Sequence, residues 1–375
     1  MMADTFPLDV KALRKVLNYL NVGVYITDPE RRVVLWNRKA EQITGYRESD
    51  VIGRPCHDNV LNHIDKDGKR LCPSDRCPLH RSMLLGRAGD ESLLVFANTA
   101  EGERIAVTVD VAPLFSDDGT VIGGIEVFRD ETEQVRDLEL AKEVQRHILP
   151  KSMPVSDAVQ MDACYYPHDL IGGDFYDIYP VGENRYGVLV ADVRGHGVSA
   201  SLCTMLLKSL GERLRSKAGE PSEFVTALNS EITSFLQDEN FATALYTVVD
   251  MESAQVAYTN AGHCAPFHFR AADGTVNPLE SHGLPLGIIA GMDYETGKLD
   301  LAPGDLLLAY TDGATESVCS DGEMLDEDGL AEVLKGAMAD GVDGLLERLY
   351  GKVLNTCGTV GMEDDVLMFS VFRRP

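Results

Sequence analysis

The chain carries little positive charge. It has 34 lysine and arginine residues against 60 aspartate and glutamate residues, which gives a formal net charge of −26 at pH 7. Such a surface repels a nucleic-acid backbone, and the basic pairs Arg14-Lys15 and Arg31-Arg32 are isolated rather than part of a basic block. We therefore expect no nucleic-acid partner, whereas the same charge favours basic or divalent partners.

Long apolar runs are absent as well. No run approaches the roughly twenty residues that cross a bilayer, and residues 1–7 lack the basic region and apolar core of a signal peptide. We therefore predict a cytoplasmic protein without a membrane partner, in which the eight cysteines are mostly reduced. The 44% hydrophobic content is ample for globular cores, and 375 residues favour two domains over one.

What the chain does have is a set of acidic motifs, each with an aspartate at a glycine turn or at the edge of a strand-like apolar run. They are Gly172–Asp177 (GGDFYD), Asp192–Gly197 (DVRGHG), Thr311–Gly313 (TDG) and Glu363–Asp365 (EDD). Any one motif alone is better explained as a solvated or capping turn, because Asp-Gly is common in turns. If the strands lie side by side, however, the carboxylates converge and repel one another unless cations bind them. Oxygen ligands favour Mg²⁺ or Mn²⁺, whereas zinc prefers histidine and cysteine.

These motifs carry a resemblance to a known family. The successive segments are GGDFYD, DVRGHG, FATALYTVVD (241–250), NAGH (260–263), GLPLG (283–287), YTDGATE (310–316) and EDDV (363–366). In this order they resemble the signatures of the SpoIIE/RsbU-like branch of the metal-dependent PPM protein phosphatases. The resemblance covers roughly residues 140–373. It implies a two-sheet β-sandwich flanked by helices, and a protein serine/threonine phosphatase with two Mn²⁺ or Mg²⁺ ions as cofactors.

The resemblance also implies a set of metal ligands. By position in the family's motifs, Asp192 would bridge the two ions, with the carbonyl oxygen of Val193 as a further ligand. Asp174, Asp312 and Asp364 would complete the metal site. Asp192 and Asp312 are therefore candidate catalytic residues as well as candidate ligands. The reaction implied is in-line attack of a metal-activated water on a phosphoserine or phosphothreonine.

Neighbouring residues leave parts of this assignment open. His196 is a further candidate catalytic residue, as proton donor to the leaving group, with packing or orientation of its turn as the alternative role. Asp177 and Asp365 are alternative ligands, because adjacent acids leave the choice open by one position. Arg194 and Leu367 stand where the family usually has a small residue and a threonine. Neither change removes a ligand, so we expect activity to be retained.

The region before residue 130 has a different pattern. It predicts a helix at 9–20, strands at 21–28 and 32–37, short helices at 38–44 and 49–52, a long polar segment to about 81, and strands at 92–98, 104–115 and 121–129. This order and the segment GVYITDPERRVVLWNRKAEQITGY (23–46) resemble a PAS domain. The resemblance implies a sensor with an antiparallel sheet and helices, which binds a small ligand or cofactor or provides a dimer contact.

The polar segment of this region is rich in cysteine and histidine. Its candidate sensor residues are Cys56, Cys72, Cys77 and His80. Their density predicts ligation of zinc, an iron–sulfur cluster or haem, or else a redox switch. Paired C-x2-C arms are missing, and a loop with small buried thiols is the alternative. The remaining cysteines are expected to fill cores: Cys164, Cys203, Cys264, Cys319 and Cys357.

The chain therefore divides into a PAS-like domain (1–130), a connecting helix (131–150) and a phosphatase-like domain (151–375), an α+β protein overall. The helix has an apolar seam with three/four spacing, at Val135, Leu138, Ala141, Val144/Gln145 and Ile148, so two copies could pair as a homodimer. A plain linker helix is the alternative.

In the last domain, strands are predicted at 161–166, 175–179, 186–191, 243–250, 255–259, 266–270, 305–310 and 366–373, with helices at 199–216, 221–236, 328–338 and 342–354.

Three functions remain in competition at this point. The resemblance favours a phosphatase that acts on a phosphorylated protein, typically a STAS-domain anti-anti-sigma factor in a bacterial partner-switching pathway. The alternative is a metal- or redox-sensing PAS dimer whose phosphatase-like domain binds a partner without turnover. A metal-dependent nucleotide or phosphodiester hydrolase is disfavoured by the charge and by the absence of a P-loop motif.

Overall fold

The computed structural model describes residues 10–58, 60–66, 68–72, 74–89, 91–195, 197–236, 240–279, 283–319, 323–357 and 364–375. The chain forms two compact units, Met1–Asp137 and Leu138–Pro375, called unit 1 and unit 2 below. The predicted boundaries, after residues 130 and 150, lie on either side of helix α5 (Thr132–Ile148), and the division between the units falls within that helix. No helix among the described residues is both long and apolar enough to span a membrane.

Unit 1 is built on one antiparallel sheet with the strand order β2-β1-β5-β4-β3. Its elements are α1 (Val10–Tyr19), β1 (Gly23–Thr27), β2 (Val33–Trp36), α2 (Arg38–Thr44), α3 (Glu48–Val51), α4 (Pro78–Leu85), β3 (Leu93–Asn98), β4 (Arg104–Phe115) and β5 (Val121–Asp130). The rings of Tyr25, Trp36 and Phe128 pack together in its core, with centroids 5.6 to 6.4 Å apart. The predicted antiparallel sheet with helices is confirmed.

Helix α4 is the element that the sequence pattern did not predict, because it begins inside the segment read as a polar loop. Pro78 occupies its first turn, and Gly86 ends it in the left-handed region at φ 62°. Leu79 and Met83 on this helix are buried in the core of unit 1, where the helix packs on β4 and β5. The helix has only 8 residues, too few for its apolar spacing to be distinguished from a loop.

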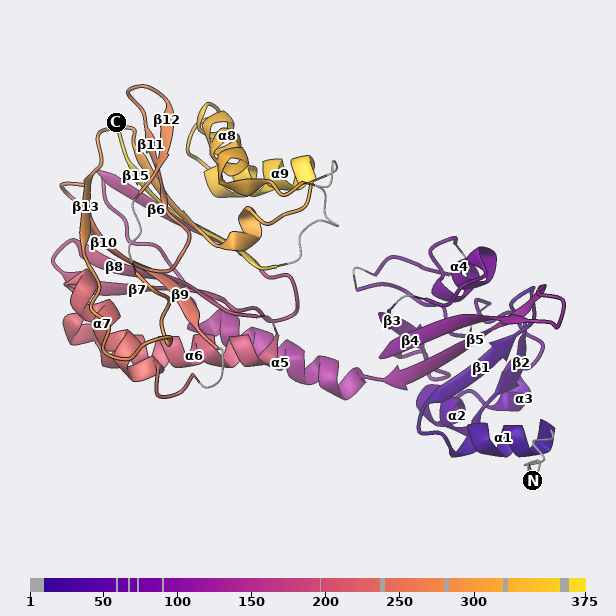
Figure 1. Ribbon diagram of the computed structural model, residues 1–375. Helices are drawn as coiled ribbons and strands as arrows, with labels where there is room; N and C mark the ends of the chain where they lie inside the picture. Colours follow the sequence, from indigo (N-terminus) through magenta and orange to yellow (C-terminus); the bar gives the residue numbers. More distant parts are fainter. Residues whose placement is uncertain are drawn as a thin grey trace, which may run out of the picture. The chain divides into compact units, whose positions relative to one another are not determined.

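Unit 2 has two five-stranded sheets, with orders β13-β10-β9-β8-β7 and β12-β11-β14-β15-β6 (Figure 1). The strands are β6 (Val159–Tyr166), β7 (Asp174–Gly182), β8 (Arg185–Val193), β9 (Ala242–Asp250), β10 (Gln255–Ala261), β11 (Phe267–Arg270), β12 (Thr275–Pro278), β13 (Gly297–Asp300), β14 (Leu306–Tyr310) and β15 (Val366–Arg373). The helices are α6 (Val198–Arg213), α7 (Pro221–Ile232), α8 (Asp326–Met338) and α9 (Leu345–Cys357). Short 3-10 turns lie at Arg215–Lys217 and Asp312–Ala314.

The layers of unit 2 are held by three apolar clusters. One packs α6 and α7 on the first sheet, for example Leu207 and Phe224 against Tyr246. Another packs α8 and α9 on the second sheet, and the third fills the space between the two sheets. Figure 1 shows the two helix pairs on opposite outer faces. The predicted two-sheet sandwich flanked by helices is confirmed, while the edge strands β12 and β13 were missed because they are short and mostly polar.

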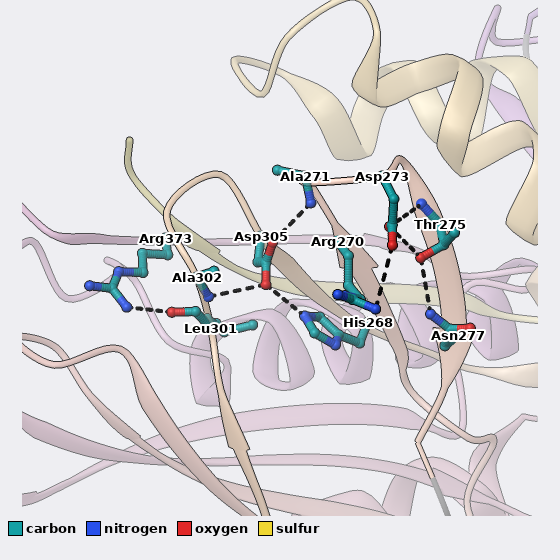
Figure 2. Close-up of polar contacts among 10 residues, drawn as sticks. All are labelled: His268, Arg270, Ala271, Asp273, Thr275, Asn277, Leu301, Ala302, Asp305 and Arg373. Carbon is teal, nitrogen blue, oxygen red and sulfur yellow. Dashed lines mark hydrogen bonds and ion pairs between the residues drawn. The ribbon is translucent and has the colours of Figure 1, made fainter.

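A polar cluster fixes the start of β14 (Figure 2). The Asp305 carboxylate accepts hydrogen bonds from the backbone N–H groups of Ala271 at 2.9 Å and Ala302 at 3.0 Å. Its Oδ2 also lies 2.9 Å from Nε2 of His268 on β11. Because β14 spans only Leu306–Tyr310, this anchor at one end sets where Asp312 lies at the other.

Two of the predicted core-filling cysteines are bonded to each other. Cys319 and Cys357 lie in the core of the second sheet as expected, but they also form a disulfide, which was not predicted, whereas the other six cysteines are free thiols. They are 38 positions apart in the chain. Sequence gave no reason to pair them, since only the packing of α9 beside the segment that follows Asp312 brings them together.

Candidate active site

Two of the predicted ligands are direct neighbours across a pair of strands. Strands β7 and β8 are antiparallel, with Asp174 opposite Asp192 in the register. Residues that face each other in this way have Cβ atoms only about 5 Å apart. The carboxylates of the GGDFYD and DVRGHG motifs therefore lie together at one end of the first sheet.

The second sheet brings its own carboxylates to the same place. Strands β14 and β15 pair with Tyr310 opposite Met368. Asp312 follows β14 and Asp364 precedes β15, so both lie at the same end of this strand pair. Thr311 links this end to the first sheet, because its hydroxyl donates to Oδ2 of Asp174 at 2.7 Å. The same hydroxyl accepts from the backbone N–H of Leu367 at 2.9 Å.

The electrostatics of the cluster reflect this crowding. Burial, and next the charge of Asp192, raise the pKa of Asp174 well above its ordinary value. Burial, followed by the charges of Asp312 and Asp364, raises the pKa of Asp192 to about 7. Burial and the charge of Asp364 raise the pKa of Asp312 to about 6. Carboxylates that repel one another in this way are relieved by bound cations.

The oxygen atoms around the cluster suit hard cations in kind. A Cβ on Gly173 would stand only 2.7 Å from the carbonyl oxygen of Val193 and 3.0 Å from that of Gly195, so glycine lets these carbonyls approach the start of β7. Carboxylates with carbonyls form the ligand set that Mg²⁺ and Mn²⁺ prefer. Within the described residues, however, no three Asp, Glu, His or Cys side chains stand together in a ligating arrangement. What the four aspartates share is their position, their negative charge and oxygen atoms of the kind that hard cations bind.

Asp365 lies in the same place but has a different set of contacts. Its carboxylate accepts backbone N–H groups from His168 at 2.8 Å, Gly173 at 2.7 Å and Asp174 at 3.3 Å. The hydroxyl of Tyr165 lies 3.4 Å away. Asp365 therefore holds the loop that carries the first motif, which supports Asp364 rather than Asp365 as the ligand.

Asp177 does not join the cluster. Its carboxylate is buried and bound by Nζ of Lys208 on α6, at 2.8 and 2.9 Å. This ion pair satisfies the charge locally. The alternative in which Asp177 is a metal ligand has no support from this geometry.

Three further candidate residues remain, His196, Arg194 and Leu367, and the structure describes the last two. His196 lies outside the described residues, so its candidate catalytic role stays a prediction. The guanidinium of Arg194 lies over the ring of Phe241, 5.4 Å from its centroid, and its backbone N–H donates to the Phe241 carbonyl. The side chain of Leu367 is fully buried in the cluster between the sheets.

Gln145 on α5 is a site residue that the sequence pattern assigned to the wrong role. It was placed on the apolar seam, but its side chain is buried and bonded to the loop that precedes Asp174. Its Nε2 donates to the Gly172 carbonyl at 2.8 Å and to Thr204 at 3.3 Å, and its Oε1 accepts from the Gly172 N–H at 3.3 Å. A buried amide in an apolar seam was the available signal. Leu140 and Val144, one helical turn apart, are instead the exposed apolar residues of α5.

The candidate sensor residues gather in unit 1. Cys56, Cys72 and Cys77 are buried in one core, and Sγ of Cys72 lies 3.9 Å from Sγ of Cys77. His80 is half-buried on α4. In this unit too, no three of the described metal-binding side chains have a ligating arrangement, and the predicted zinc or cluster site stays a prediction.

Comparisons with known proteins agree with this fold. A family model described as Stage II sporulation protein E (SpoIIE) matches residues 182–374, and a PAS domain model matches residues 21–133. The chain is 32% identical over 189 residues to phosphoserine phosphatase RsbP of Bacillus subtilis, covering 49% of this chain and 46% of that protein. It is 28% identical over 218 residues to phosphoserine phosphatase RsbU of the same species, covering 58% and 64%. The chain thus spans about half to just under two thirds of these relatives.

Solved structures are similar to unit 2. The SiaA-PP2C domain of Pseudomonas aeruginosa superposes with a TM-score of 0.58 at 23% identity, covering 65% of this chain and 98% of that one. The RsbU and RsbW domains of a Mycobacterium tuberculosis protein give a TM-score of 0.52 at 25% identity, covering 60% and 63%.

The fold and the matches together define the class, a PAS domain joined to a SpoIIE/RsbU-like domain with the PPM-phosphatase fold. More narrowly, the chain belongs to the Stage II sporulation protein E family.

Proposed function

We propose that the chain is a Mn²⁺- or Mg²⁺-dependent phosphatase that removes phosphate from serine or threonine residues of a protein under the control of its PAS domain. The observation that carries the proposal is the convergence of Asp174 and Asp192 from one sheet with Asp312 and Asp364 from the other. The two Bacillus subtilis relatives, both described as phosphoserine phosphatases, support it.

In this proposal the carboxylates of Asp174, Asp192, Asp312 and Asp364 and the carbonyl of Val193 hold the ions. When bound, the ions would supply an acidic water as nucleophile and neutralise the phosphoryl oxygens. The residues of the chain preorganise the ligands. Thr311 orients Asp174 by its hydrogen bond.

The substrate and assembly are proposed on the family resemblance. We propose a phosphorylated STAS-domain protein of a partner-switching pathway as substrate, and a homodimer as the active form. The exposed pair Leu140 and Val144 offers a small apolar face on α5 for a second copy, in place of the seam predicted from sequence. We also propose a cytoplasmic location.

The test is phosphate release by the purified full chain with Mn²⁺, from a serine-phosphorylated STAS-domain protein and from p-nitrophenyl phosphate. Asp192→Ala and Asp312→Ala should each lower the rate at least about a hundredfold, because each removes a ligand charge from the site. Asp273→Ala is the matched control, since this exposed aspartate lies in the β11–β12 turn. Equal rates for wild type and both site variants would favour the alternative, a PAS dimer that binds its partner without turnover.

A further inference from the structure

Two cysteine thiols in the core of unit 1 are in direct contact. Sγ of Cys72 donates toward Sγ of Cys77 at 3.9 Å, although the residues come from different sides of the segment at 73–76. Both side chains are buried, at 6% and 2% exposure. Thiols that only fill a core need no such contact.

The position of Cys77 polarises the pair. Cys77 is the residue that precedes the first turn of α4, where backbone N–H groups are unpaired within the helix. The thiol of Cys72 as donor, and then the N–H of His80, lower the pKa of Cys77 to about 6 against the opposing effect of burial. The same contact and burial raise the pKa of Cys72. The pair thus has one sulfur with thiolate character beside one that keeps its proton.

An unsatisfied carboxyl group lies beside the thiols. Glu126 on β5 is 1% exposed, and among the described residues its carboxyl oxygens make no regular hydrogen bond, although the Tyr25 side chain is close enough to act on its pKa. Burial, and next the charge of Cys77, raise the pKa of Glu126 well above its ordinary value. His63, whose Nε2 lies 3.7 Å from Oε1 of Glu126, is also buried, and burial lowers its pKa to about 4.

A dithiol accounts for this arrangement with two sulfur atoms alone. The described cysteine, histidine and acidic side chains of the unit form no ligating group of three. A dithiol needs only two sulfurs in contact, one of them ionised and the other able to attack it after oxidation. A buried carboxyl group with as few hydrogen bonds as Glu126 is often retained for its chemistry.

We propose that Cys72 and Cys77 form a redox-active dithiol, which a hydroperoxide oxidises to a disulfide. The Cys77 thiolate attacks the terminal oxygen of the peroxide, the O–O bond breaks, and the alcohol or water leaves with a proton, so that Cys77 becomes a sulfenic acid. The Cys72 sulfur then attacks that sulfur, the S–O bond breaks, and water leaves with the Cys72 proton. In sum, two thiols and one hydroperoxide give a disulfide, an alcohol or water, and a second water.

The step would alter the core of unit 1. Closing the sulfurs from 3.9 Å to the bond length of about 2.05 Å shortens their separation by close to 2 Å, so at least one of them moves by about 1 Å or more. Helix α4, which begins at Pro78 directly after Cys77, packs on β4 and β5. Strand β5 continues in the chain directly into α5, so the change would occur beside the segment that leads to unit 2.

The experiment uses the reduced full chain and hydrogen peroxide, followed by alkylation and tryptic digestion without reductant. Trypsin cleaves after Arg70, Arg76 and Arg81, so a Cys72–Cys77 disulfide joins the peptides 71–76 and 77–81 into one species of defined mass. At pH 7 we expect the Cys77 thiol to be lost about tenfold faster than that of Cys203, because its pKa is lowered whereas burial raises that of Cys203, and the weaker nucleophilicity of a low-pKa thiolate offsets part of the difference in ionisation. In Cys72→Ser, dimedone should label Cys77 as the sulfenic acid.

Control variants separate the dithiol from general oxidation. Cys164→Ser, which removes a thiol buried in unit 2, should leave the joined peptide unchanged, and Cys77→Ser should abolish it with no label on Cys72. Unlinked peptides at a peroxide dose that oxidises Cys203 would overturn the proposal. So would stoichiometric zinc in the purified chain that protects both thiols until a chelator removes it. Phosphatase activity is not needed for either readout.

Discussion

The carboxylate of Asp365 binds backbone N–H groups. It accepts N–H groups from three residues that lie more than 190 positions away in the chain. A Cβ on Gly172 would overlap its Oδ2, so glycine is required there for the contact. The adjacent Asp364 is less buried, and its Oδ1 accepts the Asp365 N–H at 2.7 Å. Asp365 therefore has a structural role, whereas the adjacent Asp364 is the candidate ligand.

This division predicts opposite phenotypes for two neighbouring substitutions. Asp365→Asn should lower the free energy of unfolding by about 2 kcal/mol. The amide nitrogen would face backbone N–H groups whose hydrogen bonds the carboxylate oxygen now accepts. Asp364→Asn should change stability by less than about 0.5 kcal/mol and lower the Mn²⁺-dependent rate. Urea denaturation and phosphate release measure the two effects. The reverse pattern would assign the ligand to Asp365.

The charge of Asp192 predicts a pH dependence of the metal-free protein. Its pKa of about 7 lies above the unfolded value near 4, so its contribution to stability is complete below pH 4 and is lost as the pH rises to 7. Asp192→Asn cannot ionise and avoids this loss. In EDTA, the variant should gain stability over wild type by up to roughly 1.4 kcal/mol per pH unit between pH 4 and 7, and no more above. A difference that stays constant from pH 4 to 8 would contradict this.

At the scale of elements, α5 does more than connect the two units. Its last turns belong to unit 2, where Gln145 bonds both the N–H and the carbonyl of Gly172. Gly172 in turn adjoins Asp365 and precedes the loop to Asp174. The helix therefore contacts the backbone that places a candidate ligand.

Gln145→Leu tests this contact, because leucine fills similar space without hydrogen bonds. The buried N–H and carbonyl of Gly172 would lose their partners, so we expect a loss of about 1–3 kcal/mol in stability. The Mn²⁺ concentration for half-maximal phosphatase rate should rise severalfold. Arg146→Ala, exposed on the same turn, is the control and should change neither quantity. If the leucine variant matched this control, α5 would be a plain linker.

At the scale of the molecule, the two units have separate apolar cores. Leu79 is fully buried in the core of unit 1, and Leu207 is fully buried between α6 and the first sheet of unit 2. Each core cluster of the described residues draws its members from one unit alone. The described part of the chain therefore should unfold in two steps rather than one.

Calorimetry of two matched variants checks this expectation. Leu79→Ala and Leu207→Ala each remove the same atoms from a full core and should cost about 2–5 kcal/mol. Leu79→Ala should lower the melting temperature of one transition, and Leu207→Ala that of the other. A single transition lowered by both variants would mean that the units unfold as one cooperative body.

The sequence by itself determined the fold class and the general location of the site. The apolar runs at 186–191 and 366–373 are a local signal, because a strand covered on both faces buries nearly every side chain whatever strand lies beside it. The acidic motifs at strand ends followed from the same runs. The missed elements, α4, β12 and β13, are short, so their patterns carried little signal.

Only the tertiary structure decided what each of these side chains does. Asp177 meets Lys208, Asp365 meets backbone N–H groups, Cys72 meets Cys77, and Cys319 meets Cys357. Each partner is supplied by a separate turn, helix or loop, and the cost of a buried charge or thiol depends on that partner. Local pattern places a residue on a strand or in a turn, whereas the chain's long-range packing selects its neighbours and thereby its chemistry.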